Sequence, residues 1–542
     1  MLDYVIGVDL GTSVVKATLV AVRPTEPPNA QPGGVVATAS RTVQMHHPGP
    51  GEAEQDPEEF VAAALSAMAE VASLAGIEPC SVAGIAFSGQ MGGAMAIDRH
   101  GQALTPWYPS TLDVRYQPYL QPVLAAAGSR LLALGGAVPI LAPRIAWWRG
   151  ELPALYGQID KVLLLANFVA ARLCGLAGDA ICCDPSYLTW TGLADTARRT
   201  WSDELANLWG VSLDCLPRIV AAGDVVGGLN GEAAQRCGLC AGTPVVAGAG
   251  DQVAGFLGAG LVEPGQLIDV AGTFPVFATC LDRCLMDGEQ HIFQPLAGPL
   301  GEQHWYAMMY IGGGGLTHHW FAEQYGLLDM PAARRQLAED DAHLAYAQLD
   351  AMAADLPPGA QGMLFIPHLL GRACPPDPAV RGAWLGFTWT HGPAQFYRSL
   401  LESIAYDYAQ ALSVLRGELP ELPYDVVRVI GGGSRSSVWN QIKADVLGLP
   451  YVRLSEGDRA ALGCAILAGH AVGIYPDMAA AARSFAQPRD TTFPRAEWHA
   501  CYQGYVEVYR RSFDHLREIY TALGALSSRP WPPPAACAPP GE

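Results

Sequence analysis

Two stretches of the chain share one pattern of apolar and polar positions. In residues 4–20 an apolar run is followed by a polar turn containing Gly11 and Thr12 and by a second apolar run. Residues 265–278 repeat this order, with Gly272 and Thr273 in the turn. Apolar runs on either side of a short glycine turn are typical of a β-hairpin. The repeat therefore predicts two related halves, each with its own hairpin.

A different pattern lies in the middle of the chain. The apolar run 244–247 leads into Gly248 and Gly250, which are followed by Asp251 and the apolar segment 253–257. This order predicts a buried strand that turns at its glycines, presents Asp251 at its end and continues into a helix. In the alternative interpretation Asp251 only caps that helix, as Asp often does.

A helix is predicted directly after the first hairpin. Asp56 is a capping residue, and Pro57 suits the first helical turn. Glu59 completes the pattern of a capping box. We expect this helix to end near Gly76.

Two further segments have a clear period. Residues 81–93 are an apolar run that ends in small and polar residues, which predicts a buried strand whose end meets a ligand. Between residues 502 and 520, aromatic and apolar residues recur every three or four positions. That spacing predicts a helix with one side in the core.

The length of 542 residues and the half-hydrophobic composition predict a globular protein of two or more domains. The net charge of −19 argues against nucleic-acid or anionic-membrane partners, because a phosphate surface would be repelled. A small anion would need a local site of backbone N–H groups or a metal. Lysine occurs only at Lys16, Lys161 and Lys443, so Lys16 beside a glycine turn is notable.

The chain shows no basic leader, and its apolar runs are broken before the length of a bilayer span, so a cytoplasmic protein is expected. The thirteen cysteines show no regular spacing, which favours reduced thiols over a disulfide framework. Cys237 and Cys240 form a C-x-x-C motif, but Cys280 and Cys284 lack the spacing of a zinc ribbon. A metal or redox role is therefore the weaker interpretation.

The turn of the first hairpin carries candidate chemistry in Asp9, Thr12, Ser13 and Lys16. Backbone N–H groups and hydroxyls in such a turn can hold phosphate oxygens, and a nearby carboxylate can hold the water shell of Mg²⁺. An ordinary surface hairpin is the alternative. The second copy of the pattern favours the phosphate interpretation.

Glycine-rich turns also precede predicted helices at 310–316 and 429–440. Backbone N–H groups at a helix N-terminus can meet phosphate or ribose. A Rossmann dinucleotide site competes with this interpretation, but no acidic residue follows at the distance that such a site requires.

Taken in order, these motifs resemble those of the FGGY carbohydrate kinases, and within them most closely the xylulokinases, over nearly the whole chain. The resemblance implies an α/β fold of two actin-like (ribonuclease H-like) ATPase domains with a catalytic cleft between them. It implies a sugar-binding N-terminal domain at 1–261 and an adenosine-binding C-terminal domain at 262–526. Residues 527–542, rich in Pro and Ala, are expected to be disordered.

The resemblance also implies roles for individual residues. Asp251 would be the catalytic base, ionised at neutral pH if its pKa is the ordinary value of about 3.9. Asp9 would hold Mg²⁺ through water. The residues expected to bind ATP are Gly11, Thr12, Ser13, Lys16, Gly272, Thr273, Gly431, Gly432, Gly433, Ser434 and Asn440. Those expected to bind the sugar are Gln90, Met91, Trp107, Asp113, Arg115 and Gln252, together with Asp251.

The chain departs from the family pattern near the expected sugar. Gly92 stands where the family has a sugar-contacting histidine, and Gln252 stands where xylulokinases usually have Asn. For Trp107, Asp113 and Arg115 the alternative is a core tryptophan and a structural ion pair. Arg144 replaces a common lysine and receives no role, because Arg and Lys differ in donor geometry.

The expected reaction moves the γ-phosphoryl of MgATP to a hydroxyl of a ketose, D-xylulose or a related pentulose first. Ribulose, erythrulose or a glycerol-like polyol are alternatives, as is a non-catalytic sugar-binding regulator on the same fold. An actin-like chaperone ATPase is the weakest alternative, because it would lack the sugar segments. The expected partner is a small sugar, with no nucleic acid and no membrane; a homodimer is one open arrangement.

Overall fold

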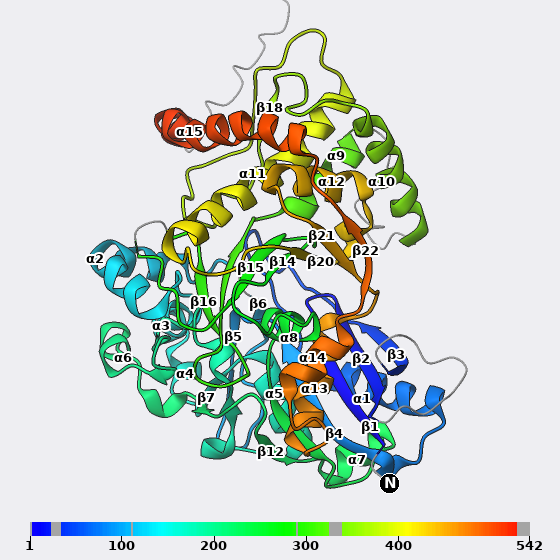
Figure 1. Cartoon of the computed structure of the whole chain (residues 1–542). Coiled ribbons are helices and arrows are strands. Elements are labelled where there is room, and N and C mark those ends of the chain that lie inside the picture. The colour runs from blue at the N-terminus through cyan, green and yellow to red at the C-terminus, as the bar shows by residue number, and fades with distance from the viewer. Residues whose placement is uncertain (1–2, 23–33, 110–111, 289–290, 325–338, 528–542) are drawn as a thin grey trace, which may run out of the picture.

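A computed structural model describes residues 3–22, 34–109, 112–288, 291–324 and 339–527 (Figure 1). Within these ranges the chain forms two large mixed sheets, one from each half of the sequence. Figure 1 shows the first sheet in the lower part of the molecule and the second above it. Residues 528–542 of the predicted tail lie outside the described residues, and Ser527 ends the last helix.

The first sheet has the strand order β12-β13-β4-β1-β2-β3. The first hairpin forms as predicted, because β1 and β2 pair antiparallel with Asp9 opposite Lys16. On its other side β1 runs parallel to β4, and β4 runs parallel to β13. The strands are β1 (Tyr4–Leu10), β2 (Val14–Ala21), β3 (Val35–Thr42), β4 (Val82–Gly89), β12 (Val225–Gly228) and β13 (Pro244–Gly250).

The second sheet, ordered β16-β17-β15-β14-β20-β21-β22, contains the same arrangement. The second hairpin is β14 with β15, and β14 runs parallel to β20, which runs parallel to β21. The predicted duplication and the two-domain α/β fold are therefore confirmed. These strands are β14 (Leu267–Val270), β15 (Val276–Leu281), β16 (Gln294–Ala297), β17 (Trp305–Tyr310), β20 (Val427–Ile430), β21 (Tyr451–Leu454) and β22 (Pro488–Thr492).

Helices and short strands surround the two sheets. The helices are α1 (Pro57–Ala75), α2 (Gln117–Gly135), α3 (Leu141–Glu151), α4 (Pro153–Tyr156), α5 (Leu165–Cys174), α6 (Asp203–Trp209), α7 (Gly231–Cys237), α8 (Asp251–Gly258), α9 (Gly314–Gln324), α10 (Glu339–Ala354), α11 (Pro393–Glu418), α12 (Ser437–Leu447), α13 (Arg459–Ala471), α14 (Met478–Phe485) and α15 (Ala496–Ser527). The short strands are β5 (Gly93–Ile97), β6 (Tyr108–Pro109), β7 (Lys161–Leu163), β8 (Cys182–Cys183), β9 (Ala194–Asp195), β10 (Thr200–Trp201), β11 (Arg218–Ile219), β18 (Leu364–Ile366) and β19 (Ala383–Leu385).

Helix α1 begins and ends where the sequence predicts. Asp56 caps it by accepting a hydrogen bond from the Glu58 N–H, and Gly76 ends it with a left-handed φ of 60°. The predicted capping box is wrong, because the Glu59 carboxylate accepts instead from the Gln44 N–H at 3.0 Å. That bond ties α1 to the segment after β3. The aromatic face of α15 is confirmed: Tyr502, Tyr509, Phe513 and Tyr520 are buried, and Tyr505 and Leu516 pack against the core in part.

Helix α13 comes from the second half of the sequence but packs on the first sheet, beside β1, β4 and α8. The contact is close enough to require glycine. A Cβ on Gly7 of β1 would lie 1.8 Å from the Ala461 carbonyl oxygen, and a Cβ on Gly463 would lie 1.9 Å from the Ala254 carbonyl oxygen. Part of the predicted domain 262–526 is thus built into the core of the first half.

The cysteines need a correction. Cys80 and Cys240 form a disulfide across 160 residues, with their Cα atoms 5.1 Å apart, so not every thiol is free. Cys237 of the C-x-x-C motif is buried and unbonded, and the described residues hold no group of three side chains suited to a metal. None of the described helices has both the length and the apolar character needed to cross a bilayer.

Candidate active site

The end of β13 places Asp251. Gly248 has a φ of +73°, and a Cβ there would lie 1.9 Å from the Phe87 carbonyl oxygen. The β13–β4 register shifts between Val246 and Ala249, where the chain bulges around this contact. A residue other than glycine would both adopt a disfavoured φ and collide with β4. The predicted turn at the glycines is therefore confirmed.

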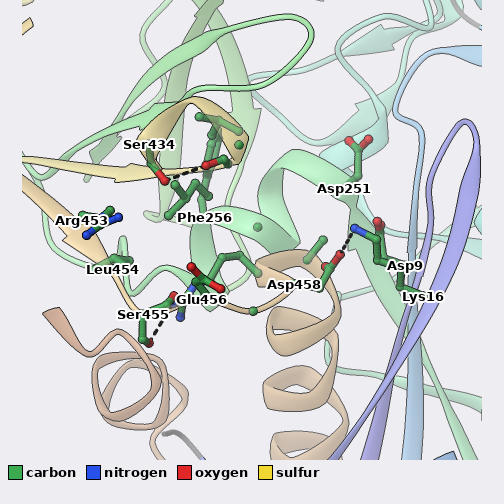
Figure 2. A pocket seen from close by; sticks show the side chains of 18 of the residues that line it. Asp9, Lys16, Asp251, Phe256, Ser434, Arg453, Leu454, Ser455, Glu456 and Asp458 are labelled. Carbon is green, nitrogen blue, oxygen red and sulfur yellow. Dashed lines mark hydrogen bonds and ion pairs between the residues drawn. The ribbon is translucent and has the colours of Figure 1, made fainter. Parts of the chain in front are cut away.

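Asp251 is the first residue of α8, and Gly250 is the cap. One carboxylate oxygen of Asp251 accepts from the Gln252 N–H at 2.7 Å. The side chain is half-buried and lines a cavity of about 710 Å³ (Figure 2). Burial raises the pKa of Asp251 to about 7, and the Gln252 N–H lowers it only in part. The expected ordinary pKa is therefore corrected upward, into the range of a general base.

Asp9, Lys16 and Asp458 line the same cavity (Figure 2). Asp9 accepts from the Ser88 hydroxyl at 2.7 Å, and Lys16 lies 3.0 Å from Asp458. Burial raises the pKa of Asp9 well above its ordinary value, and repulsion from Asp458 and Asp251 adds to the rise. Sequence reasoning missed Asp458, although an Asp directly before a helix, here the cap of α13, is a recognisable signal.

These charges bear on the predicted Mg²⁺ site. Asp9, Asp251 and Asp458 gather at one cavity, and their repulsion shows an excess of negative charge there. A divalent cation would relieve that repulsion. Among the described residues no three carboxylates, imidazoles or thiols are arranged to hold a metal directly. The donor set therefore fits Mg²⁺ held mainly by water and phosphate oxygens, which is the usual manner of Mg²⁺.

The second hairpin and the glycine loops line an adjoining cavity of about 1050 Å³. Gly432 and Arg435 line both cavities, so the two spaces meet there. Of the residues expected to bind ATP, the larger cavity brings together Ser13, Gly272, Thr273, Gly432 and Gly433, and the smaller one brings together Lys16, Gly431, Gly432 and Ser434.

The loop at 431–434 is fixed to the second hairpin by close backbone contacts. Gly431 has a φ of +86°, and a Cβ there would lie 2.8 Å from the Ala271 carbonyl oxygen. The Gly433 N–H donates to that same oxygen at 2.9 Å. The turn 271–273 and the glycine loop therefore form one rigid surface, on which backbone N–H groups can meet an anion.

Three residues expected to bind ATP do not line either cavity. Gly11 is required by the hairpin itself, since a Cβ there would lie 2.8 Å from the Val14 carbonyl oxygen. The Thr12 carbonyl accepts from the side-chain amide of Gln55. Asn440 is buried and its amide donates to the Ser434 carbonyl at 2.7 Å. Asn440 thus braces the glycine loop, which corrects its predicted role as a direct contact.

The residues expected to bind the sugar divide into two groups. Gln252 lines the cavity with Asp251, and Met91 packs on Gly250, where a Cβ would lie 2.4 Å from the Met91 side chain. Gln90 is 7% exposed, and its amide nitrogen has no hydrogen-bond partner within the described residues. Gln90, Met91 and Gln252 therefore remain candidates on geometry.

Trp107 and Asp113 are placed elsewhere. Trp107 is fully buried, with its ring 2.4 Å from the position of a Cβ on Gly93, so it offers no face to a sugar. Asp113 is fully buried, and each of its carboxylate oxygens accepts two hydrogen bonds, from Ala53, Arg115 and Arg144. No acceptor capacity is left for a hydroxyl. The core interpretation of both residues therefore replaces the sugar-binding one.

Arg115 and Arg144 hold that buried carboxylate from two sides. Arg115 also pairs with Glu54 at 2.8 Å and lies over the Tyr108 ring, 4.9 Å from its centre. Arg144, for which no role is predicted, is fully buried and donates to both the carboxylate and the backbone carbonyl of Asp113. Arg115 is thus part of a structural network, with only a fifth of its side chain exposed.

Comparisons with known proteins agree with this architecture. The N-terminal domain of the FGGY family of carbohydrate kinases matches residues 4–258, and its C-terminal domain matches residues 271–472. A xylulose kinase of Bacillus subtilis (strain 168) is 28% identical over 531 residues, covering 96% of this chain and 99% of the relative. A gluconokinase of the same strain is 26% identical over 478 residues, covering 87% and 88%.

A solved structure gives the same result. The crystal structure of xylulose kinase from Rhodospirillum rubrum superposes with a TM-score of 0.82 at 26% identity, covering 96% of this chain and all of that one. The fold is therefore shared along almost the whole length of both chains.

Proposed function

The chain belongs to the FGGY family of carbohydrate kinases, enzymes that phosphorylate an alcohol group of a sugar, and we propose that its reaction transfers the γ-phosphoryl of MgATP to a hydroxyl of a ketose. D-xylulose or a related pentulose is the proposed substrate. The observation that carries this proposal is the position of Asp251, a half-buried carboxylate in a cavity that adjoins the space between the two hairpins.

Asp251 is proposed as the group that receives the hydroxyl proton. Its pKa of about 7 leaves a large ionised fraction at neutral pH, while making the carboxylate a stronger acceptor than an exposed Asp. Only one of its oxygens is engaged by the Gln252 N–H. The carboxylate can therefore orient a hydroxyl and accept its proton late in a loose transition state.

Phosphate binding is proposed for the two turns and the glycine loop. Backbone N–H groups from these segments, with Lys16 as a cation, would hold the phosphate oxygens. Asp9 would hold Mg²⁺ through water, and Mg²⁺ would supply charge neutralisation for the transferring phosphoryl group. The Ser88 hydroxyl keeps one Asp9 oxygen in place for that role.

Substrate choice is proposed to depend on Gln252 and Gly92. Gln252 lines the cavity beside Asp251, and its amide can donate to a substrate hydroxyl. Gly92, in contrast, supplies no side chain to its segment. These two positions favour a second candidate, a kinase for another ketose or a polyol, on the same chemistry.

A coupled ADP-release assay across pentuloses, tetruloses, hexuloses and polyols would test the proposal. We expect ADP release to depend on one class of sugar and to fall by about 10²- to 10⁴-fold in Asp251→Asn, because the base is lost. Asp477→Asn is the matched control, since Asp477 caps the exposed N-terminus of α14 away from the cavity. ATP turnover that ignores every sugar, or that survives Asp251→Asn, would contradict the proposal.

A further inference from the structure

A buried hydrogen-bond chain leads to the residue before Asp251. Its members lie in the 3₁₀ turn Pro185–Tyr187, directly after β8, where Asp184 caps the turn. Asp184 accepts from the Ser186 N–H at 3.0 Å and from the Ser186 hydroxyl at 2.6 Å. Because the hydroxyl hydrogen goes to Asp184, the oxygen of Ser186 presents its lone pairs away from that carboxylate.

Those lone pairs meet the strand that carries Asp251. The Gly250 N–H donates to the Ser186 hydroxyl oxygen at 2.7 Å. One residue earlier, the Ala249 carbonyl accepts from the Tyr187 hydroxyl at 2.9 Å. The Ala249–Gly250 peptide group is therefore held through both its carbonyl and its N–H by side chains from a single turn, more than 60 residues earlier in the sequence.

The place of this contact matters because the sheet alone holds the strand weakly there. The β13–β4 register shifts between Val246 and Ala249, at the bulge around Gly248. After the bulge only Ala249 and Gly250 pair with β4 before the helix begins. A small change in the direction of the Ala249–Gly250 peptide group would move the side chain of Asp251, the next residue.

None of the three side chains can act on a substrate directly. Asp184 is 2% exposed, and Ser186 and Tyr187 are fully buried. None of them lines either of the two cavities described above. Their effect on the reaction must therefore pass through the backbone of β13.

We infer that Asp184, Ser186 and Tyr187 are positioning residues for phosphoryl transfer, forming a brace that fixes Ala249 and Gly250 and so sets where the Asp251 carboxylate lies. The inference rests on the proposed role of Asp251 as the base. Displacement of a reacting group by about 1 Å can cost about 10²-fold in rate. The brace is thus expected to govern turnover while leaving substrate binding nearly unchanged.

The test compares variants of the full-length protein at pH 8, where Asp184 and Asp251, each with a pKa of about 7, are mostly ionised. Ser186→Ala removes the acceptor of the Gly250 N–H. We expect kcat to fall about 10- to 100-fold, with KM for sugar and for MgATP within about twofold of wild type. Ser186→Thr keeps the hydroxyl and is expected to restore kcat to within about threefold.

Two further variants separate positioning from stability. Tyr187→Phe removes only the hydroxyl bond to Ala249, without leaving a large void, and is expected to lower kcat about threefold or more. Ser403→Ala is the control, because Ser403 is fully buried in α11 and its hydroxyl donates to the Leu400 carbonyl at 2.7 Å, far along the chain from β13. It is expected to keep wild-type kcat whatever it loses in melting temperature.

The outcomes are distinguishable. Wild-type kcat in both Ser186→Ala and Tyr187→Phe would overturn the inference, as would an equal loss of kcat in Ser403→Ala. If Ser186→Ala does not fold, Tyr187→Phe decides the matter. Asp251→Asn is measured alongside: full activity there refutes the proposed function, whereas an inactive Asp251→Asn with wild-type kcat in both Ser186→Ala and Tyr187→Phe refutes only the brace.

Discussion

Replacing Asp458 by Asn should move the acidic limb of the pH profile to lower pH. Asp458 lies at the cavity with Asp9 and Asp251, and its negative charge raises the pKa of both. Asn is as good a helix cap as Asp, so the start of α13 should survive the change. The substitution also removes the ion pair between Asp458 and Lys16, whose positive charge lowers the pKa of Asp9. Both effects therefore have the same sign.

The size of the limb follows from the pKa of Asp251, which burial raises to about 7. The ionised fraction of such a group is about one tenth at pH 6 and about nine tenths at pH 8, so kcat/KM should rise about tenfold across this range. In the proposed mechanism Asp9 must also be ionised to attract Mg²⁺, and its raised pKa would add to the same limb. Burial is the main cause for both, so Asp458→Asn should shift the limb by about half a pH unit.

The assay is sugar-dependent ADP release from pH 5.5 to 8.5, with MgATP held well below its KM so that the free enzyme is the species titrated. Asp477→Asn supplies the control, because it makes the same change at the exposed cap of α14 and should leave the profile in place. A flat profile between pH 6 and 8 would refute the raised pKa of Asp251. A limb that moves upward in Asp458→Asn would refute the repulsion between the carboxylates.

Two further predictions concern the frame around the site. Gly248→Ala should destabilise the fold by about 3 kcal/mol or more and reduce activity, because its Cβ would collide with the Phe87 carbonyl at a positive φ. Gly504→Ala is the control, because Gly504 lies in a helix with open space around it. That variant should raise or preserve the denaturant midpoint. Lys443→Met should lower the unfolding free energy by about 3 kcal/mol, because it leaves the buried Asp269 without its cation at 2.5 Å. A loss of about 3 kcal/mol should lower the melting temperature of a chain of this length by more than about 2 °C. A melting temperature within about 2 °C of wild type in Gly248→Ala or in Lys443→Met would therefore contradict the corresponding prediction.

Most of the fold could be predicted from the sequence because its signals are local. The two hairpins, α1 with its caps, and the strand leading to Asp251 each depend on residues close together in the chain. The repetition of the hairpin then predicted the duplicated sheets. What local signals could not show is that α13 crosses to the first sheet, since that depends on glycines of β1 and α8 fitting a distant helix.

The candidate site was harder to predict from the sequence, because it too depends on contacts between distant residues. Trp107 and Asp113 have the residue types of a sugar site, but burial and the arginines that surround Asp113 give them a structural task. The residues next to them in the sequence do not reveal that they are buried or that arginines surround Asp113. The Asp184–Ser186 turn was missed because its importance lies in a contact with Gly250, 64 residues away, which no spacing rule describes.

The distribution of lysine bears on how this acidic protein would bind the proposed nucleotide. Lys161 pairs with Asp179, and Lys443 is buried against Asp269, so of the three lysines only Lys16 lines the smaller cavity, together with Arg435, Arg453 and Arg459. Lys16 forms an ion pair with Asp458 in this structure, and its side chain is half exposed. A compact, flexible ammonium can leave such a partner for a phosphate at little cost. In the proposed complex the remaining phosphate charge would be met by these arginines, backbone N–H groups and Mg²⁺. Specificity for a phosphate chain would then arise from the geometry of the two turns and not from the net charge of the protein.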